Sequence, residues 1–401
     1  MGAPNSRQLP LSGIRVLELG QLIAGPFGTK LLGEFGADVI KIEPPGTGDP
    51  LRKWRIIEDG TSLWWHVQSR TKRSVTVDLR QSEGQELVRK LALEADVLVE
   101  NFRPGTIERW GLGYEELSAT NPGLIMVRVS GFGQTGPYRD RPGFGVIGEA
   151  MGGLRYLTGH PGEASVRVGI SIGDSLSALY AVIGTLLALQ ERQHSGLGQE
   201  IDVALYESVF AMMESLLPEY DATGHVRQPS GSALPGITPS NAYRTCDGDF
   251  VLIGGNGDSI FKRLMALIGR DDLGQDRTLA HNDGRAAHAA RIDAAIGAWT
   301  EQRSRDEILA ALDSAQVPAG YPYTAADIAA DPHYLARDVI RTIIRPNGEP
   351  LRVPTVFPRL SATPGRLGGT GPELGEHTDE VLQELGVDAS ARARLRAAGV
   401  L

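Results

Sequence analysis

Short apolar strands alternate with helical segments through the first 130 residues, and this alternation constrains the fold more than any other feature of the chain. Strands are predicted at residues 15–19, 38–42, 74–79, 96–100 and 124–129, with helices at 28–36 and 82–94. Strands and helices at this spacing form βαβ units, whose strands lie parallel in one sheet. Another strand at 200–204 follows a long apolar helix at 175–190. The sequence therefore predicts an α/β fold built on a largely parallel sheet.

A change of composition near residue 226 predicts a second domain. Residues 228–240 are rich in Gly, Pro and Ser, which is typical of a linker. The block that follows has its own strand and helices, predicted at 250–253, 258–267, 286–300 and 305–312. We predict a large α/β domain over residues 1–225, completed by 332–401. A linker and a smaller α+β domain are predicted over 226–331.

The composition excludes several classes of protein. The 401 residues carry 40 Lys and Arg against 49 Asp and Glu, a net charge of −9, which argues against a nucleic-acid-binding protein. Cys246 is the only cysteine and the eight histidines lack metal-ligand spacing, so we expect neither a disulfide nor a metal site. Residues 1–10 lack an apolar signal segment, and no stretch approaches the roughly 20 apolar residues of a membrane span. We expect a cytoplasmic protein that binds neither membranes nor nucleic acids.

Asp174 is the first candidate for catalysis. It lies between the glycine-bearing segment 169–173 and the predicted helix 175–190. Backbone N–H groups and the helix dipole favour an ionised carboxylate at such a terminus. A fixed carboxylate that glycines leave accessible can attack an activated acyl group. Taken alone, Asp174 is better interpreted as a helix N-cap, because Asp is a preferred N-cap residue, and only the surrounding motifs favour a catalytic role.

The beginning of the chain does not carry a dinucleotide-binding fingerprint. The turn after the first strand, residues 20–26, lacks the G-x-G-x-x-G pattern that lets the backbone approach a pyrophosphate. Gly255 and Gly257 follow a later strand, but Ile260 stands at the position of the third glycine. Nicotinamide chemistry is therefore not supported, although the sheet can be Rossmann-like in topology.

An ordered set of motifs resembles one known family. The motifs are LSGIRVLELG at 11–20, AGP at 24–26, LGEFGADVIKIEPP at 32–45, GDP at 48–50, KRS at 72–74, VENFRPG at 99–105, GFGQTGP at 131–137, LTG at 157–159, GD at 173–174, GQ at 198–199, DVALYE at 202–207 and LGEHT at 374–378. In this order they closely resemble the class III CoA-transferase family, which also holds formyl-CoA transferases, carnitine CoA-transferases and 2-methylacyl-CoA racemases. The likeness covers nearly the whole chain.

The resemblance implies a fold and a mechanism. The fold would have a Rossmann-like large domain, a smaller domain, and ring-like subunits interlocked as a homodimer. The substrates would be an acyl-CoA and a small carboxylic acid, with no permanently bound cofactor. Asp174 would attack the thioester to form an anhydride, and the CoA thiolate would then form an aspartyl-CoA thioester. The acceptor carboxylate would be activated in turn while water is excluded.

The resemblance also implies roles for individual residues. CoA would be bound by Lys72, Arg103 and Arg73 at its phosphates and by Ala24, Gln21 and Ile23 along its length; for the cations, ordinary surface charge is the alternative. Gln21 and Ile23 depart from the polar residues of formyl-CoA transferases, which argues against formate or oxalate. Gly255 and Gly257 match a glycine-rich loop that would act as a lid, although a tight turn explains them as well.

The stretch 144–159 resembles the branch that uses succinyl-CoA with dicarboxylates such as glutarate, itaconate, mesaconate or citramalate. A distal carboxylate requires a cation, for which Arg155 and Arg167 are candidates, and a structural ion pair is the alternative. Tyr138 and His66 are candidates for the acyl pocket or for the core. Glu149 stands where many of these transferases have glutamine. In its protonated form Glu149 could donate a hydrogen bond to acyl intermediates; the alternative is an ion pair with a nearby arginine.

Two other functions remain open. The racemases of this family carry a His-Asp pair about thirty residues before the aspartate that matches Asp174. Residues 143–150 contain no histidine, which favours a transferase over a racemase-type proton transfer. The other alternative is a non-catalytic CoA-binding protein, in which Asp174 only caps its helix.

Overall fold

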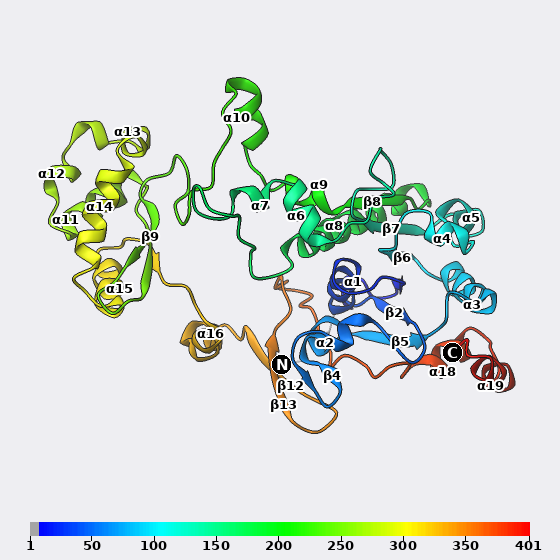
Figure 1. Cartoon of the computed structure of the whole chain (residues 1–401). Coiled ribbons are helices and arrows are strands. Elements are labelled where there is room, and N and C mark those ends of the chain that lie inside the picture. Colours follow the sequence, from blue (N-terminus) through cyan, green and yellow to red (C-terminus); the bar gives the residue numbers. More distant parts are fainter. Residues whose placement is uncertain (1–7) are drawn as a thin grey trace. The chain divides into compact units, whose positions relative to one another are not determined.

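The computed structural model of the chain describes residues 8–401 and contains two compact units (Figure 1). Within the described residues, the first unit comprises residues 8–155, 167–225 and 338–401. The second comprises residues 156–166 and 226–337. The short segment 156–166 therefore groups with the second unit, although the residues on both sides of it belong to the first.

A six-stranded parallel sheet forms the centre of the first unit (Figure 1). Its strands are β1 (Arg15–Glu18), β2 (Asp38–Glu43), β5 (Lys72–Thr76), β6 (Val97–Glu100), β7 (Ile125–Ser130) and β8 (Glu200–Ala204). They lie in the order β5-β2-β1-β6-β7-β8, and every neighbouring pair is parallel. Counted within this sheet alone, this is the order 3-2-1-4-5-6 of doubly wound folds. The predicted α/β fold with a parallel sheet is confirmed.

Helices cover both faces of the sheet because successive strand residues point in opposite directions. Val16 of β1 belongs to one buried cluster with residues of α1 (Ala24–Glu34) and α8 (Ile172–Ser195). Leu17, the next residue, belongs to another cluster with residues of α3 (Ser82–Leu93). The strands are thus buried on both faces, which explains their nearly continuous apolar sequences.

Helix α8 begins earlier than the sequence predicts. Its N-cap is Ser171, whose side chain makes no cap hydrogen bond, and Asp174 lies within the first turn of the helix. The interpretation of Asp174 as an N-cap is therefore wrong. By length and composition alone α8 could cross a membrane, contrary to the expectation from sequence, with 39% of the tested window buried. Its contacts with α1 and β7 are those of a core helix.

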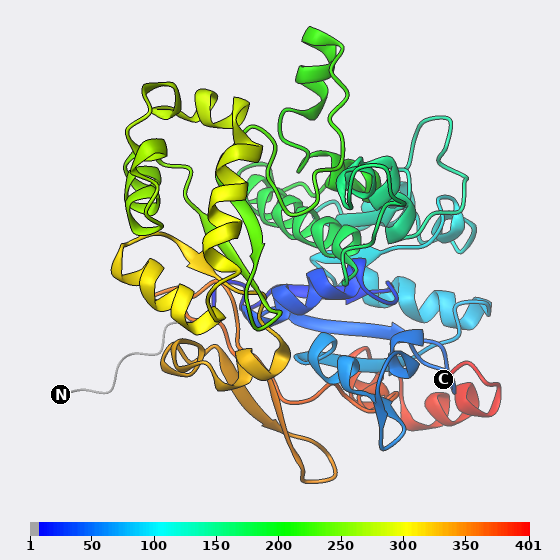
Figure 2. The same ribbon diagram turned by 60° about the vertical axis from the view of Figure 1, so that its left-hand side comes forward.

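Smaller elements complete the first unit. They are η1 (Pro50–Lys53), β3 (Ile57–Glu58), β4 (Thr61–Ser62), α2 (Leu63–Gln68), α4 (Thr106–Arg109), α5 (Tyr114–Ser118), α6 (Gly145–Met151), α9 (Leu205–Phe210), α10 (Leu216–Thr223), β12 (Ile340–Ile344), β13 (Pro350–Pro354), α18 (Thr378–Glu384) and α19 (Ala389–Ala397). Helix α7 (Leu154–Leu157) crosses from the first unit to the second. Helix α18, the last but one in the chain, packs beside the edge strand β5 (Figures 1 and 2).

The second unit is built on a small antiparallel sheet of β9 (Ser240–Arg244), β10 (Phe250–Gly254) and β11 (Ala319–Gly320). Its helices are α11 (Asp258–Leu267), α12 (Asp271–Gly274), η2 (Arg277–Leu279), α13 (Asn282–Ala287), α14 (Ala289–Thr300), α15 (Arg305–Ser314), α16 (Ala325–Ala330) and α17 (Pro332–Ala336). The helix predicted at 286–300 is split between α13 and α14. The core contains side chains of β10, α11, α14 and α15.

Candidate active site

Asp174 lines a cavity at the carboxyl ends of the central strands. The cavity measures about 180 Å³. Its walls are formed by the loops after β1, β6 and β7 and by neighbouring helices, with lining residues Gln21, Leu22, Ile23, Ala24, Asn101, Phe102, Val129, Ser130, Gly131, Gly143, Phe144, Asp174 and Leu205. Strands β1 and β6 lie side by side where the strand order reverses. Such a switch point is the usual ligand site of a parallel α/β sheet.

A second carboxylate lies close to Asp174. Glu149 of α6 is 1% exposed, and burial together with this neighbouring charge raises the pKa of Asp174 to about 6. Arg167 opposes the shift. Asp174 is therefore ionised at neutral pH but at a higher free energy than an ordinary aspartate, and this makes it a more reactive nucleophile.

Two arginines contact Glu149. Nη2 of Arg167 lies 3.3 Å from Oε1, and Nη1 of Arg155 lies 3.8 Å from Oε2. Nε and Nη1 of Arg155 are buried and form no hydrogen bond within the described residues. The structure thus brings together four predicted site residues, two carboxylates and two guanidinium groups. Arg155 keeps hydrogen-bonding capacity that the described chain does not use.

Asp174 is closely surrounded by glycine. A Cβ atom on Gly145 would fall 2.2 Å from Oδ2 of Asp174. On Gly173, a Cβ atom would lie 3.1 Å from the Gly145 carbonyl oxygen and 3.3 Å from Cγ of Glu149. These glycines let the carboxylate approach helix α6, which a larger residue at Gly145 would prevent.

Known proteins resemble the chain over almost its full length. A sequence profile described as CoA-transferase family III matches residues 11–378. The chain is 51% identical over 394 residues to the succinyl-CoA–D-citramalate CoA-transferase of Chloroflexus aurantiacus, with 98% of each chain covered. The chain belongs to CoA-transferase family III. The resemblance predicted from its motifs is confirmed, and the protein is an enzyme that transfers CoA.

Other relatives agree with this assignment. This CoA-transferase is 37% identical over 392 residues to the succinate–glutarate CoA-transferase of Agrobacterium fabrum, covering 95% of this chain and 97% of that one. Its fold matches the crystal structure of a CaiB/BaiF family protein from Brucella suis with a TM-score of 0.82 and 38% identity. That match covers 94% of this chain and 100% of the other.

The structure distinguishes the cations predicted to bind CoA phosphates. Nζ of Lys72 is fully buried, 2.8 Å from Oε2 of Glu18 and 2.7 Å from the Pro26 carbonyl oxygen, which does not support a phosphate contact. Arg73 forms an ion pair with Glu384 at 2.7 Å, which does not support a phosphate contact either. Arg103 is exposed on the loop after β6, next to a lining residue of the cavity.

Two predicted acyl-pocket residues lie outside the Asp174 cavity as the structure defines it. His66 lines a separate cavity of about 40 Å³ with Glu58, Arg345 and other polar residues. Burial and Arg345 lower the pKa of His66. The Tyr138 ring is exposed, with the Arg141 guanidinium 3.7 Å from its centroid. The structure does not bring either side chain together with Asp174.

The glycines of the predicted lid allow close packing within the second unit. A Cβ atom on Gly255 would fall 2.7 Å from Leu264 and 2.9 Å from Pro239. On Gly257 it would lie 3.1 Å from Ile260. From the other side, Arg285 donates a hydrogen bond of 2.6 Å to the Asn256 carbonyl oxygen. In this transferase the loop 254–257 is therefore closely packed against its neighbours. Its role as a lid stays a prediction.

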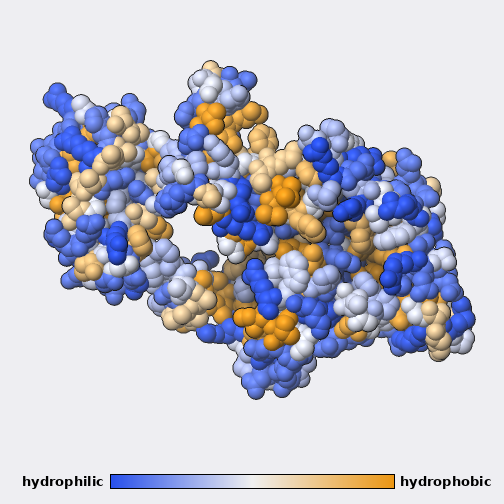
Figure 3. Space-filling model, viewed as in Figure 1, coloured by the Kyte–Doolittle hydropathy of each residue, from blue (hydrophilic) through white to orange (hydrophobic). Residues whose placement is uncertain are grey.

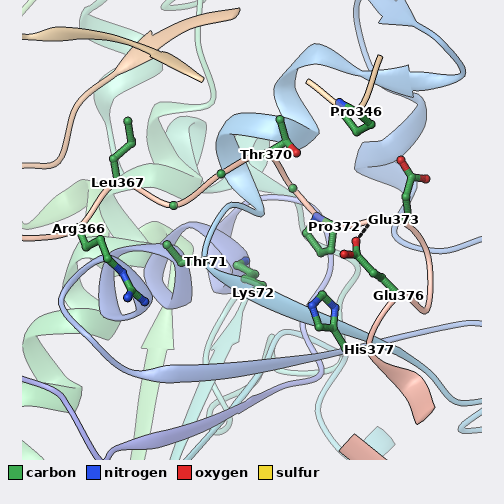
Figure 4. Close-up of a pocket in the computed structure, with 13 residues that line it drawn as sticks. Thr71, Lys72, Pro346, Arg366, Leu367, Thr370, Pro372, Glu373, Glu376 and His377 are labelled. Carbon is green, nitrogen blue, oxygen red and sulfur yellow. Dashed lines mark hydrogen bonds between the residues drawn. The ribbon is translucent and has the colours of Figure 1, made fainter. Parts of the chain in front are cut away.

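Sequence reasoning missed a larger polar cavity of about 660 Å³, lined by residues 366–373, Glu376 and His377 together with Thr71, Lys72 and Pro346 (Figure 4). The LGEHT motif at 374–378 forms part of its wall. The Gly375 amide donates to Ser74 Oγ at 2.9 Å, and the Thr76 amide donates to Thr378 Oγ1 at 3.0 Å. The motif thus pairs with the edge strand β5 of this transferase, which protects that edge. Among residues 8–401, no cluster of His, Cys, Asp or Glu could hold a metal.

Proposed function

We propose that this CoA-transferase moves CoA from succinyl-CoA to a small dicarboxylate, and that Asp174 carries the acyl group and then CoA between them. Succinyl-CoA and D-citramalate appear in the name of a relative that is 51% identical. Succinate and glutarate appear in the name of another at 37% identity. Citramalate and glutarate are both dicarboxylates, so the proposed acceptor is a dicarboxylate.

The observation that supports Asp174 most is its place at the switch-point cavity, with its pKa raised to about 6 by burial and by Glu149. Its carboxylate oxygen attacks the thioester carbon, the C–S bond breaks, and CoA leaves as the thiolate. The thiolate attacks the Asp174 carbonyl of the anhydride, which releases the donor as a free carboxylate. Each step exchanges one activated carboxyl group for another.

The second half of the reaction repeats these steps in reverse with the acceptor. Its carboxylate attacks the aspartyl-CoA thioester, releases the CoA thiolate and forms a new anhydride with Asp174. The thiolate then attacks the acceptor carbonyl carbon, which yields the new acyl-CoA and restores the Asp174 carboxylate. No proton has to be stored between these steps, so the site needs charge stabilisation more than general acid catalysis.

Arg155 and Arg167 are proposed to bind the distal carboxylate of the dicarboxylate. The unused buried Nε and Nη1 atoms of Arg155 support this role, because guanidinium groups bind carboxylates with strong directional hydrogen bonds. Glu149 partly neutralises both arginines. The site is therefore proposed to bind a monocarboxylate only weakly, because such an acid lacks the second carboxylate of a dicarboxylate. Gln21, Ile23, Ala24 and Arg103 are proposed to contact CoA, since the first three line the cavity and Arg103 lies beside it.

The proposal includes an interlocked homodimer and a cytoplasmic location. It also includes the predicted domain limits, with the large domain at 1–225 and 332–401 and the linker and small domain at 226–331. Exposed apolar side chains on α8 support a partner surface, namely Leu179, Ile183, Leu186 and Leu187. An apolar groove of about 810 Å³ lies beside α8, between α1, α2 and residues 354–360. Apolar surface also gathers on and near α10, where Met212 and Leu217 are exposed (Figure 3).

Intact-protein mass spectrometry after incubation with succinyl-CoA tests the proposal. The wild-type protein is expected to gain a CoA-sized adduct that hydroxylamine removes. Asp174→Ala is expected to show no adduct and to transfer no CoA to glutarate or citramalate, whereas Arg139→Ala, an exposed surface variant, is expected to behave as wild type.

Two other outcomes distinguish the alternatives. Exchange of the α-hydrogen of an acyl-CoA in D2O, without an acceptor acid, would instead identify a proton-transfer enzyme. CoA binding that survives Asp174→Ala, with no adduct in the wild type, would identify a non-catalytic binding protein.

A further inference from the structure

We propose that the buried Lys41 is a positioning residue for the loop of residues 20–24, which forms one wall of the Asp174 cavity. The functional part of this inference rests on Asp174 being the acylated residue. Lys41 lies in the middle of β2 and does not reach the cavity itself. Its role is therefore to hold the backbone of another element in place.

Lys41 connects three groups around the end of β1. Its Nζ atom lies 2.6 Å from Oε1 of Glu18 and 2.8 Å from Oδ2 of Asp49. It also donates a hydrogen bond of 2.9 Å to the carbonyl oxygen of Gly20, where the loop begins. The lysine side chain is only 1% exposed, so solvent does not replace these contacts.

Asp49 extends this hold to the next part of the loop. Both of its carboxylate oxygens accept from the Leu22 amide at 3.1 Å. Leu22 has a φ of 65°, a left-handed conformation that is unfavourable for a residue with a Cβ atom. The surrounding contacts must therefore stabilise this conformation, and Lys41 fixes the carboxylate that does so.

Two further side chains bind the same segment. Asn101 accepts from the Gln21 amide and donates to the Gln21 carbonyl oxygen, both at 2.8 Å. Lys72 donates to the carbonyl oxygen of Pro26, just beyond the loop, at 2.7 Å. The loop backbone is thus held at Gly20, Gln21 and Leu22. Two of the holding groups, Lys41 and Asp49, belong to one ion cluster with Glu18 and Lys72.

Glu18 and Lys41 form the charged centre of this cluster. Burial alone would raise the pKa of Glu18, but Lys41 and Lys72 together lower it to about 2. Burial alone would lower the pKa of Lys41, but Asp49 and Glu18 raise it above its ordinary value. Burial lowers the pKa of Lys72 to about 8, although Glu18 opposes this shift. Glu18 and Lys41 therefore stay charged at neutral pH, and their ion pair fixes the geometry. Buried ion pairs add little net stability and are better explained by specificity of structure.

The test compares the single variant Lys41→Met with the double variant Lys41→Met/Asp49→Asn. The single variant leaves a buried carboxylate unpaired and is expected to lower Tm. The double variant restores the charge balance and is expected to recover most of Tm, but it still lacks the donor to the Gly20 carbonyl oxygen. The matched control is Arg70→Met, which breaks the buried pair with Glu34 and touches neither the loop nor the cavity.

Three measurements are made on each full-length variant: Tm, amide hydrogen exchange of residues 20–24, and the kcat and KM for acyl-CoA. The double variant is expected to exchange faster at 20–24 and to lose about 100-fold in kcat/KM, because a displacement near 1 Å has such an effect. Its KM is expected to rise. A merely structural role would reduce the folded fraction, and so the apparent kcat, without changing KM.

The proposal is overturned if the double variant keeps kcat/KM within about threefold of wild type, or if exchange at 20–24 is unchanged. It is also overturned if Arg70→Met at an equal Tm loses as much activity. Absence of the Asp174 adduct in the wild type would remove the functional part, whereas the exchange data still decide whether Lys41 holds the loop.

Discussion

Gly145 of α6 lies directly against Asp174 of α8: a Cβ atom at position 145 would fall 2.2 Å from Oδ2 of Asp174. The start of α6 is thus packed directly against the first turn of α8. It also places Asp174 on the same side as Glu149, one turn further along α6. The position of the carboxylate is therefore set by a residue that has no side chain.

Gly145→Ala is expected to displace the Asp174 carboxylate. The backbone at 145 is compatible with alanine, so the fold should survive, but the new methyl group and the carboxylate cannot occupy the same place. We expect kcat/KM for CoA transfer to fall by about 100-fold or more. Gly169→Ala is the matched control, because a Cβ atom there meets nothing within 4 Å. Equal activities in the two variants would contradict this.

Glu149→Gln is expected to shift the pH dependence of CoA transfer. Because Glu149 helps to raise the pKa of Asp174 to about 6, its neutralisation should lower that pKa towards the ordinary value. Asp174 must be ionised to attack, so wild-type activity should fall below about pH 6 and the variant should keep activity to lower pH. The measurement is kcat/KM from pH 4.5 to 8. An unchanged acidic limb would show that Glu149 does not act on Asp174.

Asp174→Asn is expected to stabilise the fold at neutral pH. The folded pKa of about 6 lies above the ordinary value of 3.8, so the folded state binds the proton more tightly than the unfolded chain. Stability is therefore lost as pH rises from about 4 to 6, and above that range an ionised Asp174 costs about 1–2 kcal/mol, allowing for its partial exposure. The gain should appear in Tm at pH 7.5 and shrink towards pH 4.5. A gain of the same size at both values would refute the assignment.

Arg155→Ala is expected to impair the dicarboxylate acceptor selectively. A charged hydrogen bond contributes about 1.5–3 kcal/mol, so KM for glutarate or citramalate should rise roughly 10- to 100-fold. A monocarboxylate acceptor such as butyrate has no distal charge, so its KM, already higher than that of a dicarboxylate, should change little. Steady-state assays with both acceptors test this, with Arg139→Ala as the surface control. An equal loss for both acceptors would mean that Arg155 supports the fold.

Leu187→Glu is expected to break the proposed homodimer. Leu187 is 66% exposed on α8, in line with Ile183, and a charge there would be buried against the partner subunit at high cost. Light scattering coupled to size-exclusion chromatography should find a dimer for wild type and a monomer for the variant. Gln193→Glu, on the last turns of the same helix, should remain dimeric. A monomeric wild-type protein would rule out the interface.

Motif order and local pattern predicted much of the fold. Every strand of the parallel sheet was predicted, because the burial of both faces demands apolar runs that are visible in the sequence. The helix boundaries were less well predicted. The helix with Asp174 begins at Ile172, and the predicted helix 286–300 is interrupted near His288. Such ends depend on tertiary contacts that local propensity does not record.

By itself the sequence determined the α/β architecture, the family and the candidacy of Asp174, because periodicity and ordered motifs are properties of the chain read locally. Only the tertiary structure decided which charges are free. From the sequence, Lys72 is a candidate phosphate-binding cation, yet in the fold its ammonium group pairs with Glu18, 54 residues earlier. Likewise the LGEHT motif pairs with β5, about 300 residues away. The energy of a charged group depends on its partners and on its distance from water, and folding alone sets both.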